Sequence, residues 1–377
     1  MKNVTLFFAG DFCSTPSTTL LSVSEELKKL IQSCDLKIVN FEVPLKPSIF
    51  LPPQRYKRFW QNDDAPGFLR KLGFNLFSLA NNHVFDWGEE GYKKTKAVLG
   101  SDAFGSGYYD EAYDVKICEI SGVKIGFLAL TYAAYTGVFD DVLHHEGLGC
   151  AYINDLRVNH DIIKAKKYVD YLFVLPHDGI EYIDVPLPEV MARYRDFIDY
   201  GADAVIGSHP HCPQGWEEYN GKPIFYSLGN FFFNCNEDTI YREGTPYWYE
   251  GMCVKMELND MQIRYKVINT KNNYVSLWVD NSEKRNEHNQ LVCKYLQNNT
   301  LYLEYLYEQC EKLAKGQELP IIDNAIHSES WKSYTKQVLH NWLKFLRKQD
   351  ISNDDSLKTL LRNDTRRSVL MRVLKSK

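Results

Sequence analysis

The segment Gly207-Ser208-His209-Pro210-His211 follows directly on the apolar run at residues 202–206. Short apolar runs rich in β-branched residues favour buried strands. Two histidines just after such a strand lie at the carboxyl edge of a sheet, where open α/β folds place their binding sites. Imidazole is also a good ligand for Zn, Mn, Fe or Ni. Taken alone, the pair more simply indicates loop histidines that form hydrogen bonds.

Four further apolar runs lead into polar residues of the types that bind metals. They are residues 4–9 before Gly10-Asp11, residues 36–39 before Asn40-Phe41-Glu42, residues 76–80 before Asn81-Asn82-His83, and residues 171–176 before His177-Asp178. Helical patterns between them, such as those at residues 24–34 and 88–99, supply crossover connections. Five strands that each end in a carboxylate, an amide or an imidazole predict an α/β fold with one shared cluster at the strand ends.

Six motifs can be read along the first two thirds of the chain. They are Gly10-Asp11, Asn40-Phe41-Glu42, Ala80-Asn81-Asn82-His83-xx-Asp86-x-Gly88, His177-x-Gly179-x-Glu181-Tyr182, Gly207-Ser208-His209-Pro210-His211-xx-Gln214 and Tyr226-Ser227-Leu228-Gly229-Asn230-Phe231. In this order they resemble the bacterial capsule-synthesis CapA group of the calcineurin-like metallophosphoesterase superfamily, which is linked to poly-γ-glutamate synthesis. The resemblance covers residues 1–268 and implies an α/β fold, a four-layer αββα sandwich with two mixed sheets.

The resemblance also implies two divalent metal ions at the strand ends. Carried over motif by motif, it assigns Asp11 and His211 to the first metal, Glu42 to a bridge, and Asn82, His177 and His209 to the second metal. His83 matches the superfamily's histidine that assists the leaving group. Oxygen and nitrogen ligands without thiolate suit Mn, Fe or Zn. Two such ions about 3.5–4 Å apart can bind both the attacking and the leaving oxygen.

Two residues depart from the pattern of the superfamily. Cys13 stands where the first motif, Asp-x-His, has its histidine; a small buried residue is favoured over a soft metal ligand. Asp178 stands where related chains carry tryptophan; a cap of the following turn is favoured over a further carboxylate near the metals. Without the first-motif histidine, the first metal is expected to bind weakly, which leaves one firmly held ion.

Other residues near the motifs have two interpretations each. Asp86 is either an acceptor that orients His83 or the N-cap of the helix that begins near Gly88. Glu181 and Tyr182 are expected to contact the substrate or to support the ligands. Asn230 is expected at the rim of the site, with a turn amide as its alternative. His144 and His145 are expected in a solvated loop.

Composition indicates a soluble cytoplasmic enzyme. The chain has 377 residues, of which 44% are apolar and 25% charged, close to the globular average. Its nine cysteines form no CxxC pair, which indicates reduced thiols. The first apolar run is too short for a signal peptide, and no run of about twenty apolar residues predicts a membrane span. The oligomeric state cannot be read from the sequence.

The character of the chain changes near residue 269. Before this point, hairpin turns are indicated at Ser121-Gly122, Asn220-Gly221 and Asn259-Asp260. We therefore expect one domain at residues 1–268 and a helical extension at 269–377, with apolar stripes such as the one at residues 331–345 as packing faces. The extension carries a net charge of +5, against −10 for residues 1–268. Its basic end attracts polyanions in principle, but a solvated helix face is favoured, and no motif indicates nucleic-acid binding.

Together these features predict a metal-dependent hydrolase that acts on a phosphate ester or on an anionic polymer such as poly-γ-glutamate. Fold-level kinship does not decide between phosphorus and carbonyl centres. A second hypothesis is a binding or assembly component of polymer biosynthesis, in which the metals hold polymer carboxylates without catalysis. A third, suggested by Cys13 and Asp178, is a degenerate relative that acts as a regulator.

Overall fold

The computed structural model describes residues 3–48, 58–133, 137–139, 146–235 and 247–316. The chain divides into two compact units, Met1–Leu296 and Gln297–Lys377. His144, His145, the apolar stripe at residues 331–345 and the basic C-terminal end lie outside the described residues.

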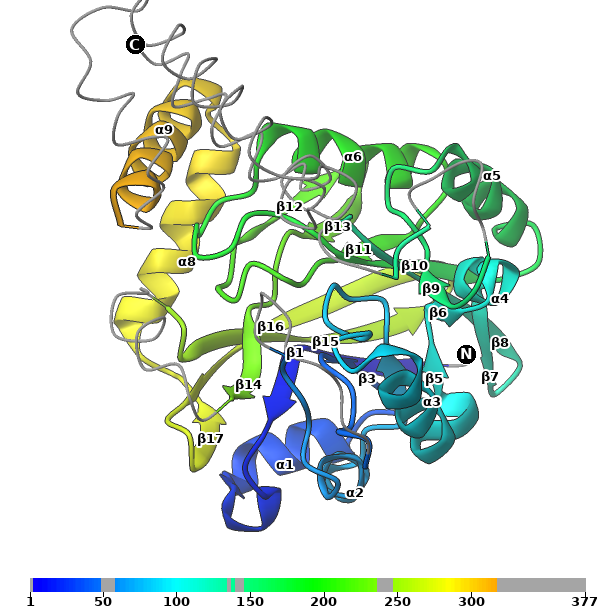
Figure 1. The fold of residues 1–377 in the computed structure, drawn as a ribbon. Helices are drawn as coiled ribbons and strands as arrows, with labels where there is room; N and C mark the ends of the chain where they lie inside the picture. The colour runs from blue at the N-terminus through cyan, green and yellow to red at the C-terminus, as the bar shows by residue number, and fades with distance from the viewer. Residues whose placement is uncertain (1–2, 49–57, 134–136, 140–145, 236–246, 317–377) are drawn as a thin grey trace, which may run out of the picture. The chain divides into compact units, whose positions relative to one another are not determined.

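Two sheets dominate the first unit (Figure 1). Among the described residues, the nine-stranded sheet has the order β2-β17-β16-β15-β1-β3-β4-β5, and β14 also pairs with β1. Its strands are β1 (Val4–Ser14), β2 (Ser22–Val23), β3 (Leu36–Phe41), β4 (Leu76–Ser78), β5 (Ala103–Phe104), β14 (Asn230–Asn234), β15 (Glu250–Asn259), β16 (Gln262–Asn272) and β17 (Ser276–Val279). The central strands β1, β3 and β4 run parallel, as expected for strands joined by crossover helices.

The second sheet has the order β12-β13-β11-β10-β8-β7 within the described part of the chain. Its strands are β7 (Lys116–Ile120), β8 (Val123–Thr131), β10 (Tyr171–His177), β11 (Ala204–Ile206), β12 (Trp216–Tyr219) and β13 (Lys222–Phe225). Two short strands, β6 (Ser106–Gly107) and β9 (Gly149–Cys150), pair apart from both sheets. The hairpins β7–β8 and β12–β13 turn at the predicted positions, and β15–β16 turns one residue later than predicted, at residues 260–261.

Helices cover the outer faces of both sheets. They are α1 (Glu25–Gln32), α2 (Ala65–Leu72), α3 (Gly88–Leu99), α4 (Tyr109–Tyr113), α5 (Leu156–Ala165), α6 (Pro188–Asp199) and α8 (Glu283–Leu296), with 3-10 turns η1 (Thr18–Leu20) and η2 (Gly100–Asp102). Figure 1 shows α1, α2 and α3 on the side of the nine-stranded sheet, and α5 and α6 on the side of the six-stranded sheet. The expected four-layer sandwich is therefore confirmed.

The alternation of side chains along β1 explains how the nine-stranded sheet packs against a layer on each of its faces. Phe7 packs into the core beneath α1, α2 and α3. Phe8 points to the opposite face, where its ring lies 5.3 Å from the ring of Phe173 in the other sheet. Because successive strand residues face opposite ways, one apolar strand serves both cores. β1 is buried on both faces, as its nearly continuous apolar sequence predicts.

The structure places Asp11 within a strand rather than after one. β1 continues past the predicted end at Ala9 as far as Ser14, and its pairing with β3 and β14 shifts register around Asp11. Such an irregularity re-aims a side chain without ending the strand. The local reason for the longer strand is pairing with β14, which joins β1 from residues 230–234.

Strands continue somewhat beyond residue 268, because β16 ends at Asn272 and β17 at Val279. The helix α8 belongs to the first compact unit, and α9 (Asn299–Gly316) belongs to the second. C-terminal helices are thus present, while a domain boundary after residue 268 stays a prediction. No helix among the described residues is both long enough and apolar enough to cross a membrane.

We expect Gly10→Ala to lower the free energy of unfolding by about 2–3 kcal/mol. A Cβ atom at Gly10 would lie 1.9 Å from the carbonyl oxygen of Gly229, which also accepts the Asp11 N–H at 2.9 Å. The matched control is Gly67→Ala in α2, where a Cβ meets no atom within 4 Å and about 0.5 kcal/mol of stabilisation is expected. Urea denaturation measures both. Equal stability of the two variants would contradict the close approach of β1 and β14.

Candidate metal centre

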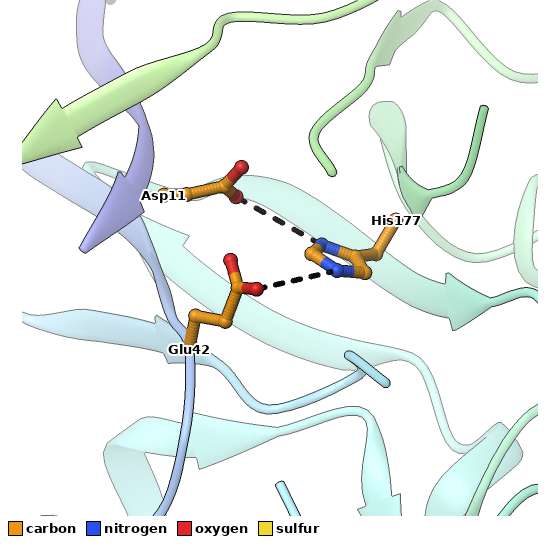
Figure 2. Close-up of side chains that lie close together, drawn as sticks. All are labelled: Asp11, Glu42 and His177. Carbon is orange, nitrogen blue, oxygen red and sulfur yellow. Dashed lines mark ion pairs between the residues drawn. The ribbon is translucent and has the colours of Figure 1, made fainter. Parts of the chain in front are cut away.

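The predicted cluster forms where the carboxyl ends of strands from both sheets meet. Asp11 lies in β1, and Glu42 directly follows β3. His177 is the last residue of β10 in the other sheet. Figure 2 shows these three side chains pointing toward one another, and their ligand atoms lie within 4.8 Å of one another. The remaining predicted ligands follow β4 and β11, which are the neighbours of β3 and β10.

Asp11 and Glu42 supply the two carboxyl groups of the cluster. Asp11 and Glu42 are both fully buried. The Asn40 amide donates to Asp11 Oδ1 over 2.7 Å and to Glu42 Oε2 over 3.4 Å, and the His209 N–H donates to Asp11 Oδ2 over 3.1 Å. Burial raises the pKa of Asp11, and this effect outweighs the charge of His211, which lowers the pKa. Burial and the neighbouring Asp11 charge hold the pKa of Glu42 well above its usual range, so a cation between them would relieve both effects.

The His177 ring faces both carboxyl groups (Figure 2). Its Nδ1 is 3.8 Å from Asp11 Oδ1, and its Nε2 is 4.0 Å from Glu42 Oε1. Ser208 Oγ lies 3.0 Å from Nδ1, and Asn82 Oδ1 lies 2.9 Å from Nε2. Burial lowers the pKa of His177 well below its ordinary value, which keeps the ring in the neutral form that binds metals. The Ser208 contact fixes the ring orientation from behind.

His211 also lies near both carboxyl groups. Its Nδ1 lies 3.6 Å from Asp11 Oδ2, and its Nε2 lies 3.7 Å from Glu42 Oε1. Asn230 Oδ1 is 2.9 Å from Nδ1 and can accept its proton, which leaves Nε2 free to bind a metal. The Trp248 ring packs on the imidazole at 5.1 Å between centres. The position and tautomer of this ring are thus set by its surroundings.

His209 completes the set of predicted ligands. Its ring centre lies 4.8 Å from that of His177 and 4.6 Å from that of Tyr132, and its Nε2 is 3.9 Å from Glu181 Oε1. The structure therefore brings all six predicted ligands into one connected cluster: Asp11, Glu42, Asn82, His177, His209 and His211.

The distances between the ligand atoms fit ligands that share a metal ion better than ligands that hydrogen-bond to one another. The four distances between carboxylate oxygen and imidazole nitrogen run from 3.6 to 4.0 Å, which is too long for hydrogen bonds. Two ligands of a tetrahedral ion with bonds of about 2.1 Å lie about 3.4 Å apart. Glu42 Oε1 is buried and accepts no hydrogen bond from any described residue. Buried polar atoms are normally satisfied, and a cation would satisfy this one.

His83 lies beside the cluster and is held by Asp86. Its Nδ1 is 3.0 Å from Asp86 Oδ2, which also accepts the Phe59 N–H over 2.9 Å. Burial alone lowers the pKa of His83, but the Asp86 charge and hydrogen bond outweigh it and raise the pKa above its ordinary value. The structure thus distinguishes the two interpretations of Asp86. The residue at the N-cap of α3 is Trp87, and Asp86 orients His83 instead.

Cys13 and Asp178 both follow the favoured interpretation. Cys13 is fully buried and packs in an apolar cluster with residues that include Val43 and Phe233. The Asp178 carboxylate accepts the Gly179 N–H over 2.7 Å and so caps the following turn.

Asn230 is placed differently from the sequence expectation. It is fully buried behind His211 rather than at the rim, and its Nδ2 donates to the Trp248 carbonyl over 3.0 Å. Its position follows from its pairing opposite Asp11 in β14, inside the sheet. Glu181 is partly exposed beside His209, and the Tyr182 ring lies 6.2 Å from that of His211. Of the three residues predicted to bind substrate, Glu181 and Tyr182 are the two that border the cluster.

Strained backbone accompanies the cluster. Glu42 is followed by Val43 at φ 66°, and Tyr182, His209 and His211 have φ values of 69°, 101° and 56°. Residues other than glycine adopt positive φ rarely, at a cost of about 1–3 kcal/mol each. Such strain gathers at functional sites because the surrounding structure must enforce it.

Three supporting residues were not identified from the sequence. Asn40 and Ser208, which contact Asp11 and His177, belong to the quoted motifs, where they are neighbours of the predicted ligands. Their signal is spacing, because Asn40 lies two residues before Glu42 in the same motif. Gln61 donates to the Glu42 carbonyl over 2.8 Å and to the Phe12 carbonyl over 2.7 Å. No motif contains Gln61, so the sequence offers no signal for it.

The fold and the cluster define an α/β protein with a buried oxygen- and nitrogen-donor site at the joined edges of two sheets. A family model described as bacterial capsule synthesis protein PGA_cap matches residues 5–235. The chain belongs to this family, as the motifs predicted.

Curated relatives include two capsule proteins from Bacillus. The PGA biosynthesis protein CapA of Bacillus subtilis is 30% identical over 220 residues, which cover 56% of this chain and 57% of the relative. The capsule biosynthesis protein CapA of Bacillus anthracis is 34% identical over 226 residues, covering 56% and 54%. The chain thus matches little more than half the length of either. Among solved structures, a novel phosphatase from Mycoplasma pneumoniae aligns with a TM-score of 0.44 at 14% identity, over 71% of this chain and 94% of that chain.

Proposed function

We propose that the protein is a metal-dependent hydrolase that acts on an anionic cell-surface polymer or on a phosphate ester connected with it. The observation that carries this proposal is the convergence of six oxygen- and nitrogen-donor side chains on a buried site, beside a histidine held by a carboxylate. The names of the curated relatives, which refer to capsule and PGA biosynthesis, support the polymer context.

The site is proposed to hold two divalent ions of Mn, Fe or Zn, or one firm and one loose ion. Asp11 and His211 would hold the first ion, Glu42 would bridge, and Asn82, His177 and His209 would hold the second. When bound, such ions polarise a scissile bond and lower the pKa of a water molecule. Cys13, which stands where the first motif has its histidine, is buried in an apolar cluster, and this supports weaker binding of the first ion.

The protein's own groups supply orientation and a proton. Ser208 and Asn230 fix the rings of His177 and His211, so that both present Nε2 to Glu42. We propose that His83, oriented by Asp86, donates a proton to the leaving group. Glu181 and Tyr182 border the site and are proposed to contact the substrate.

We expect metal-loaded protein to hydrolyse an aryl phosphate or diester, and His209→Ala or Asn82→Ala to abolish this activity. Both variants remove a proposed ligand of the second ion. The protein is purified metal-free, loaded with Mn, Fe or Zn in turn, and assayed on an aryl phosphate, an aryl phosphodiester and poly-γ-glutamate. His160→Ala, an exposed histidine of α5, serves as the control and should keep full activity. Metal content of each variant is measured alongside turnover.

A non-catalytic role in polymer assembly is the second candidate. It is favoured by a curated relative from Mycobacterium tuberculosis, 26% identical over 211 residues, which is named a probable polyglutamine synthesis accessory protein. In this role the bound ions would hold polymer carboxylates. Wild-type protein that binds metal but leaves every tested ester and poly-γ-glutamate intact would favour it over hydrolysis.

We also propose a cytoplasmic location. All nine cysteines lie within the described residues, and none forms a disulfide. Cysteines outside disulfides are typical of reducing compartments.

A further inference from the structure

The helix α8 lies outside the residues that match the family model, yet it belongs to the compact unit that carries the metal centre. It contacts both sheets (Figure 1). On the nine-stranded sheet, the Asn289 amide donates to Asn269 Oδ1 of β16 over 2.7 Å. On the six-stranded sheet, Val292 packs so close to Gly215, just before β12, that a Cβ atom there would lie 2.8 Å from Val292 Cγ1. These two contacts fix the helix on the sheets.

Arg285 of α8 holds the turn that runs from Tyr247 to Glu250. Arg285 is buried, and its Nη1 donates to Glu250 Oε2 over 2.8 Å. The Glu250 N–H donates to the Tyr247 carbonyl over 3.0 Å and closes the turn. Within this turn, Trp248 packs its ring on the His211 imidazole. Arg285 is therefore joined to a proposed metal ligand through a single turn of the chain.

His288, one helical turn further along α8, holds a second segment at the border of the site. Its Nε2 lies 3.0 Å from Oδ2 of the buried Asp184. Two residues before Asp184, the Tyr182 N–H donates to the carbonyl of Pro210 over 2.9 Å. Pro210 stands between the two ligand histidines of its loop. The His288 ring also packs on the Tyr247 ring at 4.4 Å between centres, so His288 contacts both segments.

Both segments have a strained backbone, which depends on contacts from elsewhere in the chain. Tyr182 and Tyr247 each have a φ of 69°, and His211 has a φ of 56°. Residues other than glycine keep such angles only where the surrounding structure enforces them. Arg285 and His288, three residues apart on one face of α8, contact both strained segments.

The carboxylates that α8 contacts are poorly accessible to water. The side chain of Asp184 is 3% exposed and that of Glu250 is 21% exposed. A buried carboxylate that loses a hydrogen-bonding partner carries a large desolvation cost. Loss of either α8 side chain is therefore expected to move the segment that it holds.

We propose that α8 is a positioning element of the metal centre, in which Arg285 and His288 hold the two segments that pack around His211. The proposal rests on the proposed function for the role of His211 as a ligand of the first ion. Both side chains act through Trp248 and Tyr182, whose rings lie 5.1 and 6.2 Å from the His211 ring. The working unit of the protein then includes a helix beyond the family match.

Side-chain NMR of the metal-free full chain tests this positioning directly. Histidine is isotopically labelled on its ring nitrogens, and the His211 signals are assigned by their loss in His211→Gln. We expect Arg285→Met and His288→Phe to shift the His211 signals. The matched control is Asn289→Ala, which removes a buried hydrogen bond of the same helix to β16. It should lower thermal stability and leave the His211 signals in place.

Calorimetric titration with Mn or Zn measures the consequence for metal binding. Partners that orient metal ligands are worth about tenfold to a hundredfold in affinity, and α8 acts one contact further away. We therefore expect Arg285→Met and His288→Phe to weaken binding of the first, looser ion about tenfold, and that of the second less than about twofold. Arg285→Lys keeps a cation beside Glu250 and should recover most of the affinity. Asn289→Ala should bind both ions as wild type does.

Unchanged His211 signals in Arg285→Met and His288→Phe would overturn the proposal, as would an equal shift in Asn289→Ala. Equal weakening of both ions would also contradict it, because that pattern indicates a general loosening of the fold. His288→Phe is the milder change, since it keeps a ring against Tyr247, and it decides the outcome if Arg285→Met does not fold. A wild type that binds no metal contradicts the proposed function, while the NMR comparison still decides whether α8 positions His211.

Discussion

Replacing Glu42 by glutamine is expected to lower the turnover rate about a thousandfold or more. The same change is expected to raise the thermal stability of the metal-free protein. The first effect follows because Glu42 is the proposed bridge, and its Oε1 lies 3.7 Å from His211 and 4.0 Å from His177. A neutral amide lacks the negative charge with which a carboxylate would bridge two cations, and metal-ion catalysis contributes several kcal/mol.

The gain in stability has a separate cause. Glu42 is fully buried, and burial together with the Asp11 charge disfavours its ionised form. Glutamine keeps nearly the same shape without a charge to desolvate, so the metal-free variant avoids this cost. Asp11→Asn removes the other carboxylate and is expected to act in the same direction.

Differential scanning calorimetry with and without Mn, Fe or Zn measures both effects on one sample. Wild type should gain stability from metal in a concentration-dependent way, as expected for a ligand of the folded state. Glu42→Gln should begin from a higher melting temperature and gain little. A metal-free variant that melts below wild type, or one that gains as much from metal, would show that Glu42 is a structural acid.

The sequence predicted the members of the cluster because strand ends are readable. Apolar runs of four to eight residues identify the strands, and the polar residues within a few positions after each run include the candidate ligands. β10 ends at His177 itself, and the two histidines lie three and five residues after the end of β11 at Ile206. The assignment of strands to two sheets could not be read in this way, because it depends on pairing between distant segments.

Backbone geometry set the limits of the prediction. His209 and His211 adopt positive φ, so the backbone at both positions is not the extended chain that continues a strand. Asp11 faces the site from within a strand because the register shifts there. The position of Asn230 after a strand and before an aromatic run predicts a residue at the rim, yet pairing with β1 buries it behind His211. In each case long-range contacts overrode the local pattern.

His83→Ala is expected to lower kcat by about a hundredfold to ten-thousandfold on substrates with poor leaving groups. The loss should be much smaller with an activated leaving group such as 4-nitrophenolate, which departs without a proton. Asp86→Asn leaves the His83 ring in place but removes the charge 3.0 Å from its Nδ1, so an intermediate loss of about tenfold to a hundredfold is expected. Metal content should stay at the wild-type level in both variants.

Comparing phenyl phosphate with 4-nitrophenyl phosphate separates a proton donor from a residue that merely supports the fold. A structural role would reduce both rates by the same factor, since it would disturb the whole site. A proton donor makes the rate of His83→Ala depend more steeply on the acidity of the leaving group than the rate of wild type does. Because Asp86 also accepts the Phe59 N–H, Asp86→Asn could disturb the 58–61 segment. Phe59→Leu, which keeps that N–H and removes the ring against His83, tests this and should preserve the leaving-group dependence of wild type.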